Sequence, residues 1–359
     1  MGNYGTLTLD NSTLDVKRMY NDVVTGYGIL NMSGTATLTL TDEIHGTSID
    51  VGTLAVTDGP ATLTVSGGTK DGRIDVGTLS VRDGPATLTA KSTRGKSKIE
   101  IDSLSVRDGT ATLTAKSNNL AGEIDVGTLT VTDGTARLDL AASTSTTITT
   151  VTGDTSGASL TLAPIKSATL QTVLLSTVKD IALTLEKGIT VRSASAEGVV
   201  LSGGMLDLSA ATLDPSLVTS VKDGGTLQLA DNQVDQLTAN TGSISLVSTS
   251  NVSSTLDFGE SATLDTATLN KITDSGCSVY KATDLTLTAS SGAALDLPAT
   301  SRIETGTLTL DNSGTGVTLA SGEIRLAGAN GASTAALTGA TLTLNSNSGN
   351  SADAVLRLG

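Results

Sequence analysis

A six-residue sequence, Ile-Asp-Val-Gly-Thr-Leu, begins at Ile49 and returns at Ile74 and Ile124, with the variant Ile-Glu-Ile-Asp-Ser-Leu at Ile99. The copies therefore begin 25 residues apart (49, 74, 99 and 124). Each copy is followed at a fixed distance by Asp-Gly and then by Ala-Thr-Leu-Thr or a close variant. A fixed period of this length indicates one supersecondary unit that is stacked several times.

Apolar and polar residues alternate within each unit, as in Ala-Thr-Leu-Thr-Val at residues 61–65. This period of two is typical of half-buried strands, with apolar side chains inside and threonines outside. Gly52 and Asp58-Gly59 interrupt the alternation, and these residue types accept the positive φ that corners require. One unit is therefore predicted to form three short strands around a narrow core.

The repeat predicts an all-β fold, a β-solenoid of the right-handed parallel β-helix type, with coils of about 25 residues in the first half and irregular coils after it. We divide the chain into an N-terminal lead-in or partial cap (1–23), regular repeats (24–140) and degenerate coils of the same rod (141–359). The Thr/Ser-rich segment 141–153 fits a linker or, better, an eroded coil. Segment 170–187 is compatible with a helix, but the alternation of Leu183-Thr-Leu185 favours strand.

Composition excludes several classes of function. The chain has 22 basic and 36 acidic residues and a net charge of −14, which argues against nucleic acid as a partner. No apolar run reaches the roughly 18 residues needed to cross a bilayer, so we expect no membrane insertion. The single Cys277 cannot form an internal disulfide. Because His45 is the one histidine, a catalytic triad would have to use it, and we expect neither an enzyme nor a bound cofactor.

Two columns of carboxylates are the first candidate site. Stacking at the repeat period would align Asp58, Asp83, Asp108 and Asp133, and likewise Asp50, Asp75, Glu100 and Asp125. Like charges at the strand spacing repel by roughly 1 kcal/mol even in water. Calcium bridging would offset this repulsion and is possible because hard oxygen ligands suit the ion. Alternatively, aspartate serves the turn, and Arg82 and Arg107 compensate the charge locally.

Two further surfaces follow from the repeat. An outward threonine face consists of Thr37, Thr39, Thr62, Thr64, Thr87, Thr89, Thr112 and Thr114. Regular Thr-x-Thr arrays resemble the faces that β-helical ice-binding proteins present to ice, although threonine is also a good outward strand residue. A basic loop patch consists of Lys91, Arg94, Lys96, Lys98 and Lys116. It suits an anionic glycan or a partner subunit, or it is a solvated edge whose lysines blunt strand exposure.

The octapeptide Gly-Thr-Leu-Thr-Leu-Asp-Asn-Ser occurs twice, at residues 5–12 and 306–313. Together with the Gly-Thr-Leu-x-Val-x-Asp-Gly units, it resembles the β-helical stems of large bacterial exoproteins, the filamentous-haemagglutinin and autotransporter passenger class. The resemblance implies a long stalk displayed outside the cell and used in adhesion or matrix building. It carries over no functional residue.

Solenoids normally need polar capping units at their ends. Here a coil pattern begins at Gly5, residues 354–359 still have a strand pattern, and the one candidate plug is the segment 17–22. We therefore expect a structural β-solenoid of a surface or extracellular assembly that associates with itself as a filament, sheath or layer, or that serves as an adhesin stalk. The alternatives are a phage or viral fibre or spike shaft, part of a virion, and an ice-binding protein.

Overall fold

The computed structural model describes residues 6–17, 24–42, 46–154, 157–165, 170–230, 233–237, 242–288, 301–312, 323–326 and 341–346. The chain forms two compact units, unit 1 (Met1–Ser195) and unit 2 (Ala196–Gly359). Among the described residues, helix is limited to the single turns α1 (Gln233–Gln236) and α2 (Thr266–Leu269). Each unit consists of parallel strands stacked as a solenoid, so the predicted all-β solenoid is confirmed.

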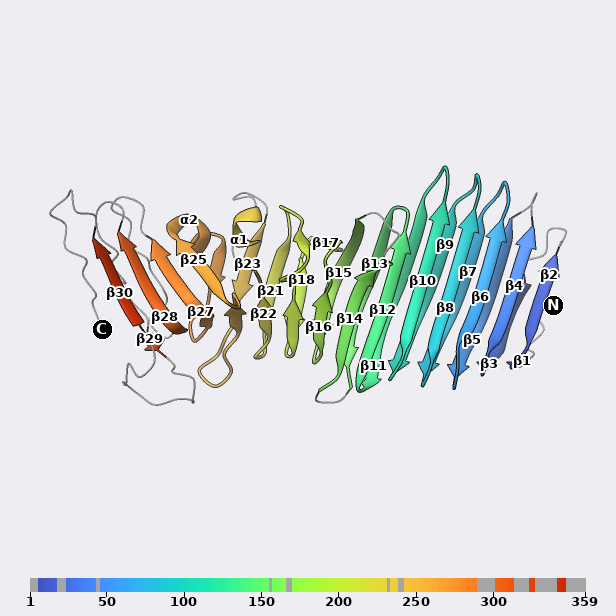
Figure 1. Ribbon diagram of the computed structural model, residues 1–359, viewed down its shortest axis with the longest axis horizontal. Coiled ribbons are helices and arrows are strands. Elements are labelled where there is room, and N and C mark those ends of the chain that lie inside the picture. The colour runs from blue at the N-terminus through green and yellow to red at the C-terminus, as the bar shows by residue number, and fades with distance from the viewer. Residues whose placement is uncertain are drawn as a thin grey trace. The chain divides into compact units, whose positions relative to one another are not determined.

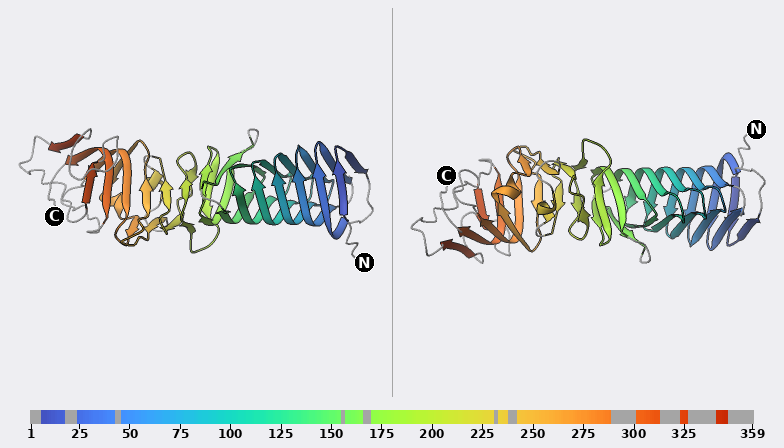
Figure 2. Two further views of the ribbon diagram at one scale, coloured as in Figure 1. Left: turned by 90° about the horizontal axis from the view of Figure 1, so that it is seen from below. Right: turned by 90° about the horizontal axis from the view of Figure 1, so that it is seen from above.

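Unit 1 contains two parallel sheets, and each turn of the solenoid contributes one strand to each sheet (Figures 1 and 2). The odd sheet of unit 1 contains β1 (Thr6–Asp10), β3 (Val24–Ser33), β5 (Thr47–Thr57), β7 (Gly72–Arg82), β9 (Ser97–Arg107), β11 (Gly122–Asp133), β13 (Ser145–Gly153), β15 (Gln171–Lys179) and β17 (Ile189–Ser193). The even sheet contains β2 (Thr13–Lys17), β4 (Ala36–Asp42), β6 (Ala61–Gly67), β8 (Pro85–Ser92), β10 (Thr110–Ser117), β12 (Thr135–Ala142), β14 (Ser159–Pro164) and β16 (Ala182–Leu185).

The expectation of three strands per turn is wrong, because the first two predicted strands are one. β5 continues through Gly52 without a break, and only its burial pattern resets there: Val51 and Leu54 are buried, whereas Gly52 and Thr53 between them are half-buried. The glycine bends the strand instead of ending it. Successive bends also stack closely, since a Cβ on Gly77 would lie 2.8 Å from the Gly52 carbonyl oxygen.

The core of unit 1 consists of in-register columns of aliphatic side chains. Leu54, Leu79, Leu104 and Leu129 are stacked in the odd sheet, and all are fully buried. Leu38, Leu63, Leu88 and Leu113 form the matching column of the even sheet. Parallel sheets buried against each other in this way obtain most of their stability from removal of apolar surface from water.

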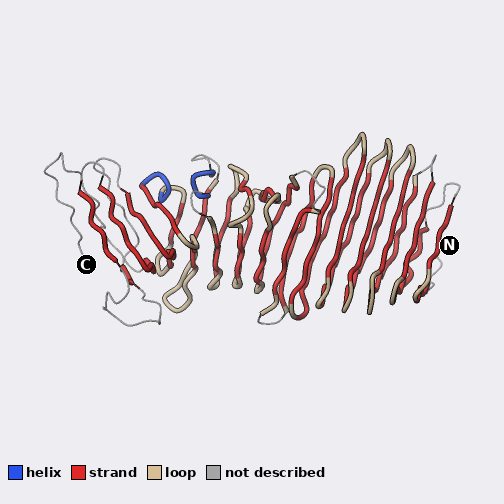
Figure 3. Tube along the Cα trace, in the orientation of Figure 1, coloured by secondary structure: helices blue, strands red, loops and turns tan. Residues whose placement is uncertain are grey.

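The two segments with competing predictions are both strands. Residues 145–153 form β13, so the Thr/Ser-rich segment is a coil of the solenoid and not a linker. Residues 171–179 and 182–185 form β15 and β16, which confirms the strand prediction over the helical one. In Figure 3 the loops of unit 1 lie at the two ends of the strands, so loop residues of successive turns come together.

Unit 2 has the same parallel pairing with shorter and less regular strands. Its first sheet contains β18 (Val199–Ser202), β21 (Val218–Lys222), β23 (Ser243–Leu246) and β26 (Ile272–Asp274). Its second contains β19 (Met205–Asp207), β22 (Thr226–Gln228), β24 (Thr255–Asp257), β27 (Val279–Thr288), β28 (Arg302–Asn312) and β29 (Glu323–Leu326), with β25 (Ser261–Asp265) on β27 and β30 (Thr341–Ser346) on β28. β20 is Thr212–Leu213.

Paired residues show how far unit 2 departs from the repeat. Val199 pairs with Thr219, 20 residues on, whereas Thr226 pairs with Thr255, 29 residues on. The core column nevertheless continues, because Leu206, Leu227 and Leu256 stack in register and are all buried. The unit therefore keeps the solenoid while its corners vary in length.

Candidate functional site

One corner of unit 1 stacks residues that have a positive φ. Turn by turn they are Asn11 (44°), Gly34 (57°), Asp58 (55°), Asp83 (54°), Asp108 (45°) and Gly134 (61°). Every one is Gly, Asn or Asp, the residue types that tolerate the left-handed region best. The aspartates are therefore explained by the backbone conformation of the turn, as the second of the two sequence hypotheses proposed.

Asp133 does not continue this column. The register of β11 on β9 shifts between Val131 and Asp133, so Asp133 pairs with Arg107 and Gly134 takes the corner. The Arg107 Nη2 atom lies 3.7 Å from the Asp133 Oδ2 atom, and Arg82 Nε donates to Asp83 Oδ2 at 3.0 Å. These arginines reduce the repulsion along the corner, which calcium had been proposed to do.

The second carboxylate column is in register as expected, with Asp50, Asp75, Glu100 and Asp125 on successive strands. Cations from the neighbouring column bridge it. Arg73 Nη2 lies 2.7 Å from Asp75 Oδ2 and 2.8 Å from Glu100 Oε2, and Lys98 Nζ lies 3.0 Å from both Glu100 Oε2 and Asp125 Oδ2. Each cation thus joins two turns of the solenoid.

Burial raises the pKa of Asp75 above its usual value of 3.8, although Arg73 opposes the shift. The neighbouring carboxylates Glu100 and Asp50 add to it. Repulsion along the column is therefore only partly compensated. Nevertheless, no group of three or more His, Cys, Asp or Glu side chains in the described part of the chain is arranged to hold a metal ion.

The predicted threonine face is present on the outer surface of the even sheet. Thr37, Thr62, Thr87 and Thr112 pair in register, as do Thr39, Thr64, Thr89 and Thr114. Seven of these side chains are half-buried by their neighbours and Thr89 is buried, at 9% exposure. In the next turn β12 is shifted by two residues, so Asp139 follows Thr112 and Ala141 follows Thr114, and the array ends.

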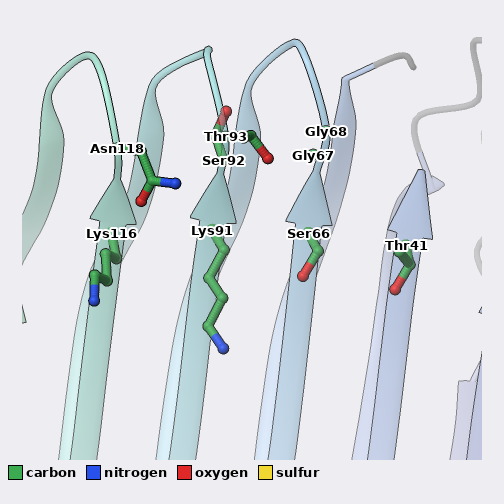
Figure 4. A pocket seen from close by; sticks show the side chains of 9 residues that line it. All are labelled: Thr41, Ser66, Gly67, Gly68, Lys91, Ser92, Thr93, Lys116 and Asn118. Carbon is green, nitrogen blue, oxygen red and sulfur yellow. The ribbon is translucent and has the colours of Figure 1, made fainter. Parts of the chain in front are cut away.

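The basic loop patch separates into three places. Lys98 lies in the odd sheet, where it is ion-paired, and Arg94 and Lys96 lie in the exposed turn between β8 and β9. Lys91 and Lys116 are in register at the ends of β8 and β10, next to Ser66 and Thr41 on the adjacent strands. Figure 4 shows the two lysine side chains side by side along the outer face.

These last residues line an open groove of about 430 Å³. Its lining, which we call the lysine groove, is Thr41, Ser66, Gly67, Gly68, Lys91, Ser92, Thr93, Lys116 and Asn118. A Cβ on Gly67 would collide with the Asp71 carbonyl, so the close approach of the turn keeps this part of the groove free of side chains. Buried Ser92 supports the wall: its Oγ donates to the Lys70 carbonyl oxygen at 2.7 Å and accepts from Gly95 N at 2.7 Å.

The first turn of unit 1 exposes core residues. Leu7 stacks on Leu30, yet it is 43% exposed whereas Leu30 is 2% exposed. In the even sheet Leu14 stacks on Leu38, with exposures of 37% and 3%. Among the described strands none pairs with the outer side of β1 or β2. We call this surface the N-terminal edge; its strands have no outer partner among the described strands, and its leucines are partly exposed.

Unit 2 holds a polar cluster that sequence analysis missed. The Asp274 carboxylate accepts hydrogen bonds from Tyr280 Oη (3.0 Å), Ser301 Oγ (2.7 Å), Ser278 Oγ (2.6 Å) and Gly276 N (2.8 Å). Tyr280 is 1% exposed, and burial, with Asp274 beside it, raises the pKa of its phenol far above 10.0. Because its hydroxyls and carboxylate oxygens are all satisfied, the cluster stabilises a corner. The one sequence feature that could have indicated the cluster is Tyr280, which follows leucines at the same position of the preceding strands.

Three sequence candidates remain without a site. His45 and residues 18–22 of the predicted plug lie outside the described residues. Cys277 forms no disulfide, is partly buried and has a φ of 61°. Among the described helices none is long and apolar enough to cross a membrane.

Comparison with known proteins adds no relative. No protein-family model matches the chain, and neither curated proteins nor solved structures give a match. Any function must therefore be argued from the surfaces above.

Proposed function

We propose that the protein is a non-enzymatic structural β-solenoid that builds a surface or extracellular assembly by associating with further copies of itself. The N-terminal edge is the observation that carries this proposal. Two strand edges that pair with no other described strand, next to two partly exposed core leucines, are a surface on which another strand pair can be added. This role agrees with the resemblance to stalks of bacterial exoproteins.

The occupant of the edge is a second copy of the chain, because the chain already stacks sequences of this kind on one another. Residues 5–11, which include β1, are repeated letter for letter at residues 306–312, which include most of β28. β28 pairs in parallel and in register with β30, so that Thr-Leu-Thr-Leu of residues 307–310 faces Thr-Leu-Thr-Leu of residues 341–344. The sequence motif at the N-terminal edge is thus one that pairs, elsewhere in this chain, with a strand of the same sequence.

Parallel, in-register addition of this kind continues the stack. A contact between different surfaces of two identical chains that continues the stack along its own axis does not close into a ring, so it produces an open filament. The exposed halves of Leu7 and Leu14 would be buried in each junction, which favours association by about 1 kcal/mol or more per side chain. The backbone hydrogen bonds of two strands add specificity of register.

Sedimentation velocity over a range of protein concentrations tests the proposal. We expect the wild-type chain to form species that grow with concentration, and Leu7→Lys combined with Leu14→Lys to prevent this. The matched control is Leu120→Lys with Leu170→Lys, because these leucines are 53% and 73% exposed but lie away from the edge. Growth that persists in the edge variant, or that both variants lose equally, would contradict the proposal.

Ice binding is a second candidate because two threonine columns are in register over four turns. Replacing Thr87 and Thr112 by Lys would abolish thermal hysteresis if the threonine face binds ice. The same variant would leave sedimentation unchanged, which separates the two candidates.

A further inference from the structure

We propose that the lysine groove binds an anionic polysaccharide. The proposal is independent of self-association, because the groove lies on the outer face near the ends of β4, β6, β8 and β10 and not on the N-terminal edge. Its volume of about 430 Å³ falls within the range of small-ligand sites in proteins.

Charge is the first argument. The chain has 14 more acidic than basic residues, yet none of the nine residues that line the groove is acidic. Lys91 and Lys116 stand on neighbouring strands, in register, and neither side chain forms an ion pair or hydrogen bond with any described residue. The backbones of these two lysines are one strand spacing apart, so their like charges are near neighbours and repel each other. An anionic group placed between them removes that repulsion.

The contrast with the other cations of unit 1 sharpens this argument. Arg73, Lys98 and Arg137 each contact two carboxylates, and these contacts link turns of the solenoid. The side chains of Lys91 and Lys116 contact no described carboxylate, which also holds for the exposed Lys70, Arg94 and Lys96, but they differ from these in standing in register on neighbouring strands. The described part of the chain therefore supplies no counter-ion for this pair of lysines.

The other lining groups indicate a sugar. Thr41, Ser66 and Thr93 present hydroxyls and Asn118 presents an amide, which hydrogen-bond to sugar hydroxyls as both donors and acceptors. The groove contains no aromatic side chain on which a nucleic-acid base could stack. The net charge of −14 also disfavours a partner as densely charged as nucleic acid. A carboxylated or sulfated polysaccharide carries fewer charges and more hydroxyls.

The register of the strands predicts a variant that binds the polysaccharide more tightly, in addition to variants that bind it more weakly. Ser66 occupies on β6 the position that Lys91 occupies on β8. Ser66→Lys therefore extends the row from two amines to three without changing the core. If the lysines were only a solvated edge and bound no ligand, Ser66→Lys would not tighten binding.

Isothermal titration calorimetry on the full chain at about 0.05 M salt, where screening is weak, provides the test. The probes are a heparin hexasaccharide for sulfate, a hexagalacturonate for carboxylate, and single-stranded DNA of equal charge. We expect one or both oligosaccharides to bind. Lys91→Gln with Lys116→Gln should weaken binding about tenfold or more, since two charge-assisted contacts are lost. Ser66→Lys should strengthen it several-fold.

The matched control is Lys179→Gln with Lys187→Gln, which removes the same charge from exposed residues several turns away from the groove. It should change the affinity by less than about twofold at this distance from the bound ligand. Equal loss in both double variants, absence of binding by either oligosaccharide, or equal binding of DNA would overturn the proposal. Unchanged circular dichroism of the variants shows that the fold is intact, and unchanged sedimentation separates this result from the assembly proposal.

Discussion

Unit 1 and unit 2 form the same kind of parallel solenoid in two different ways. In unit 1 neighbouring turns are nearly copies of one another, so each corner residue stacks on its counterpart, as in the column of positive φ from Asn11 to Gly134. In unit 2 the number of residues along the chain between paired positions changes from turn to turn. The corner residues therefore do not stack in a column. Specific side-chain hydrogen bonds hold the corners there instead.

Gln233 is the clearest example in unit 2. It is 3% exposed; its amide nitrogen donates to the carbonyl oxygens of Leu208 (2.9 Å) and Ala211 (2.8 Å), and its Oε1 accepts from Ala230 N (2.7 Å). One side chain therefore satisfies backbone groups of two turns. The comparison teaches that a regular stack needs only correct residue types at repeated positions, whereas an irregular one needs individual polar groups.

The largest expected difference concerns the core. Leu104→Ala in unit 1 should cost about 4–5 kcal/mol, the upper part of the usual range, because the 11-residue strand β9 is held between long strands on both sides and the cavity cannot collapse. Leu227→Ala in unit 2 should cost nearer 2–3 kcal/mol, because three-residue strands relax more easily. Local opening free energies from hydrogen exchange measure both. If the two substitutions destabilise their units equally, unit 1 is not more rigid than unit 2 and this prediction is wrong.

Gln233→Leu should destabilise unit 2 by about 2–3 kcal/mol, because it removes the hydrogen-bond partner of the Ala211 carbonyl and of Ala230 N, whereas the Leu208 carbonyl still accepts from Ala211 N. Gln228→Leu is the control, since Gln228 lies on the outward side of β22. Chemical denaturation followed by circular dichroism provides the measurement. If the two variants unfold together, side-chain hydrogen bonds do not hold the corners of unit 2.

A smaller effect is expected at the corner column of unit 1. Asp83→Ala should cost about 1 kcal/mol, because alanine is strained at a φ of 54°. Asp83→Gly should be close to neutral, because Gly34 and Gly134 already occupy this position in other turns. A larger loss in the glycine variant than in the alanine variant would show that the carboxylate, and not the backbone conformation, is what the corner requires.

The smallest effects concern the pH dependence of folding stability, which should have opposite signs for one aspartate in each unit. Burial raises the pKa of Asp75 in unit 1, so the stability associated with it is full below pH 3.8 and is lost as the pH rises through the raised pKa. In unit 2 burial opposes ionisation of Asp265, but hydrogen bonds from Thr268 and Ala267 outweigh it and lower the pKa. Its contribution is present above pH 3.8 and is lost as the pH falls through the lowered pKa.

Asp75→Asn should therefore be neutral or slightly stabilising at pH 7, whereas Asp265→Ala should cost about 1 kcal/mol, the usual value for loss of an N-cap. Asp265 precedes α2 and accepts from Thr268 N at 2.7 Å. Denaturation at pH 3 and pH 7 measures both signs. The same sign for both variants would contradict the assignment.

The regular part of the fold was predictable because the repeat specifies it. The strand alternation, the inward leucines and the in-register threonine columns all follow from a 25-residue period. The number of strands per turn did not follow from it, because Gly52 bends a strand without ending it. The position of Asp133 was also missed, since a one-residue register shift leaves no mark in the sequence pattern.

The candidate sites were less predictable. The basic patch was recognised as a set, but its division into ion-paired Lys98, loop residues and the lysine groove depends on which sheet each residue joins. The Asp274 cluster brings together Tyr280 and Ser301 across turns of unequal length. Without a period to align them, sequence spacing contains no information about such contacts.

Hydrogen exchange of the β1 and β2 amides, measured as a function of protein concentration, tests self-association at the N-terminal edge most directly. The account predicts that exchange in residues 6–10 and 13–17 slows as concentration rises, and that the Leu7→Lys, Leu14→Lys variant abolishes this slowing. Exchange in these strands that is independent of concentration, whether or not larger species form, would show that the N-terminal edge is not the site of assembly.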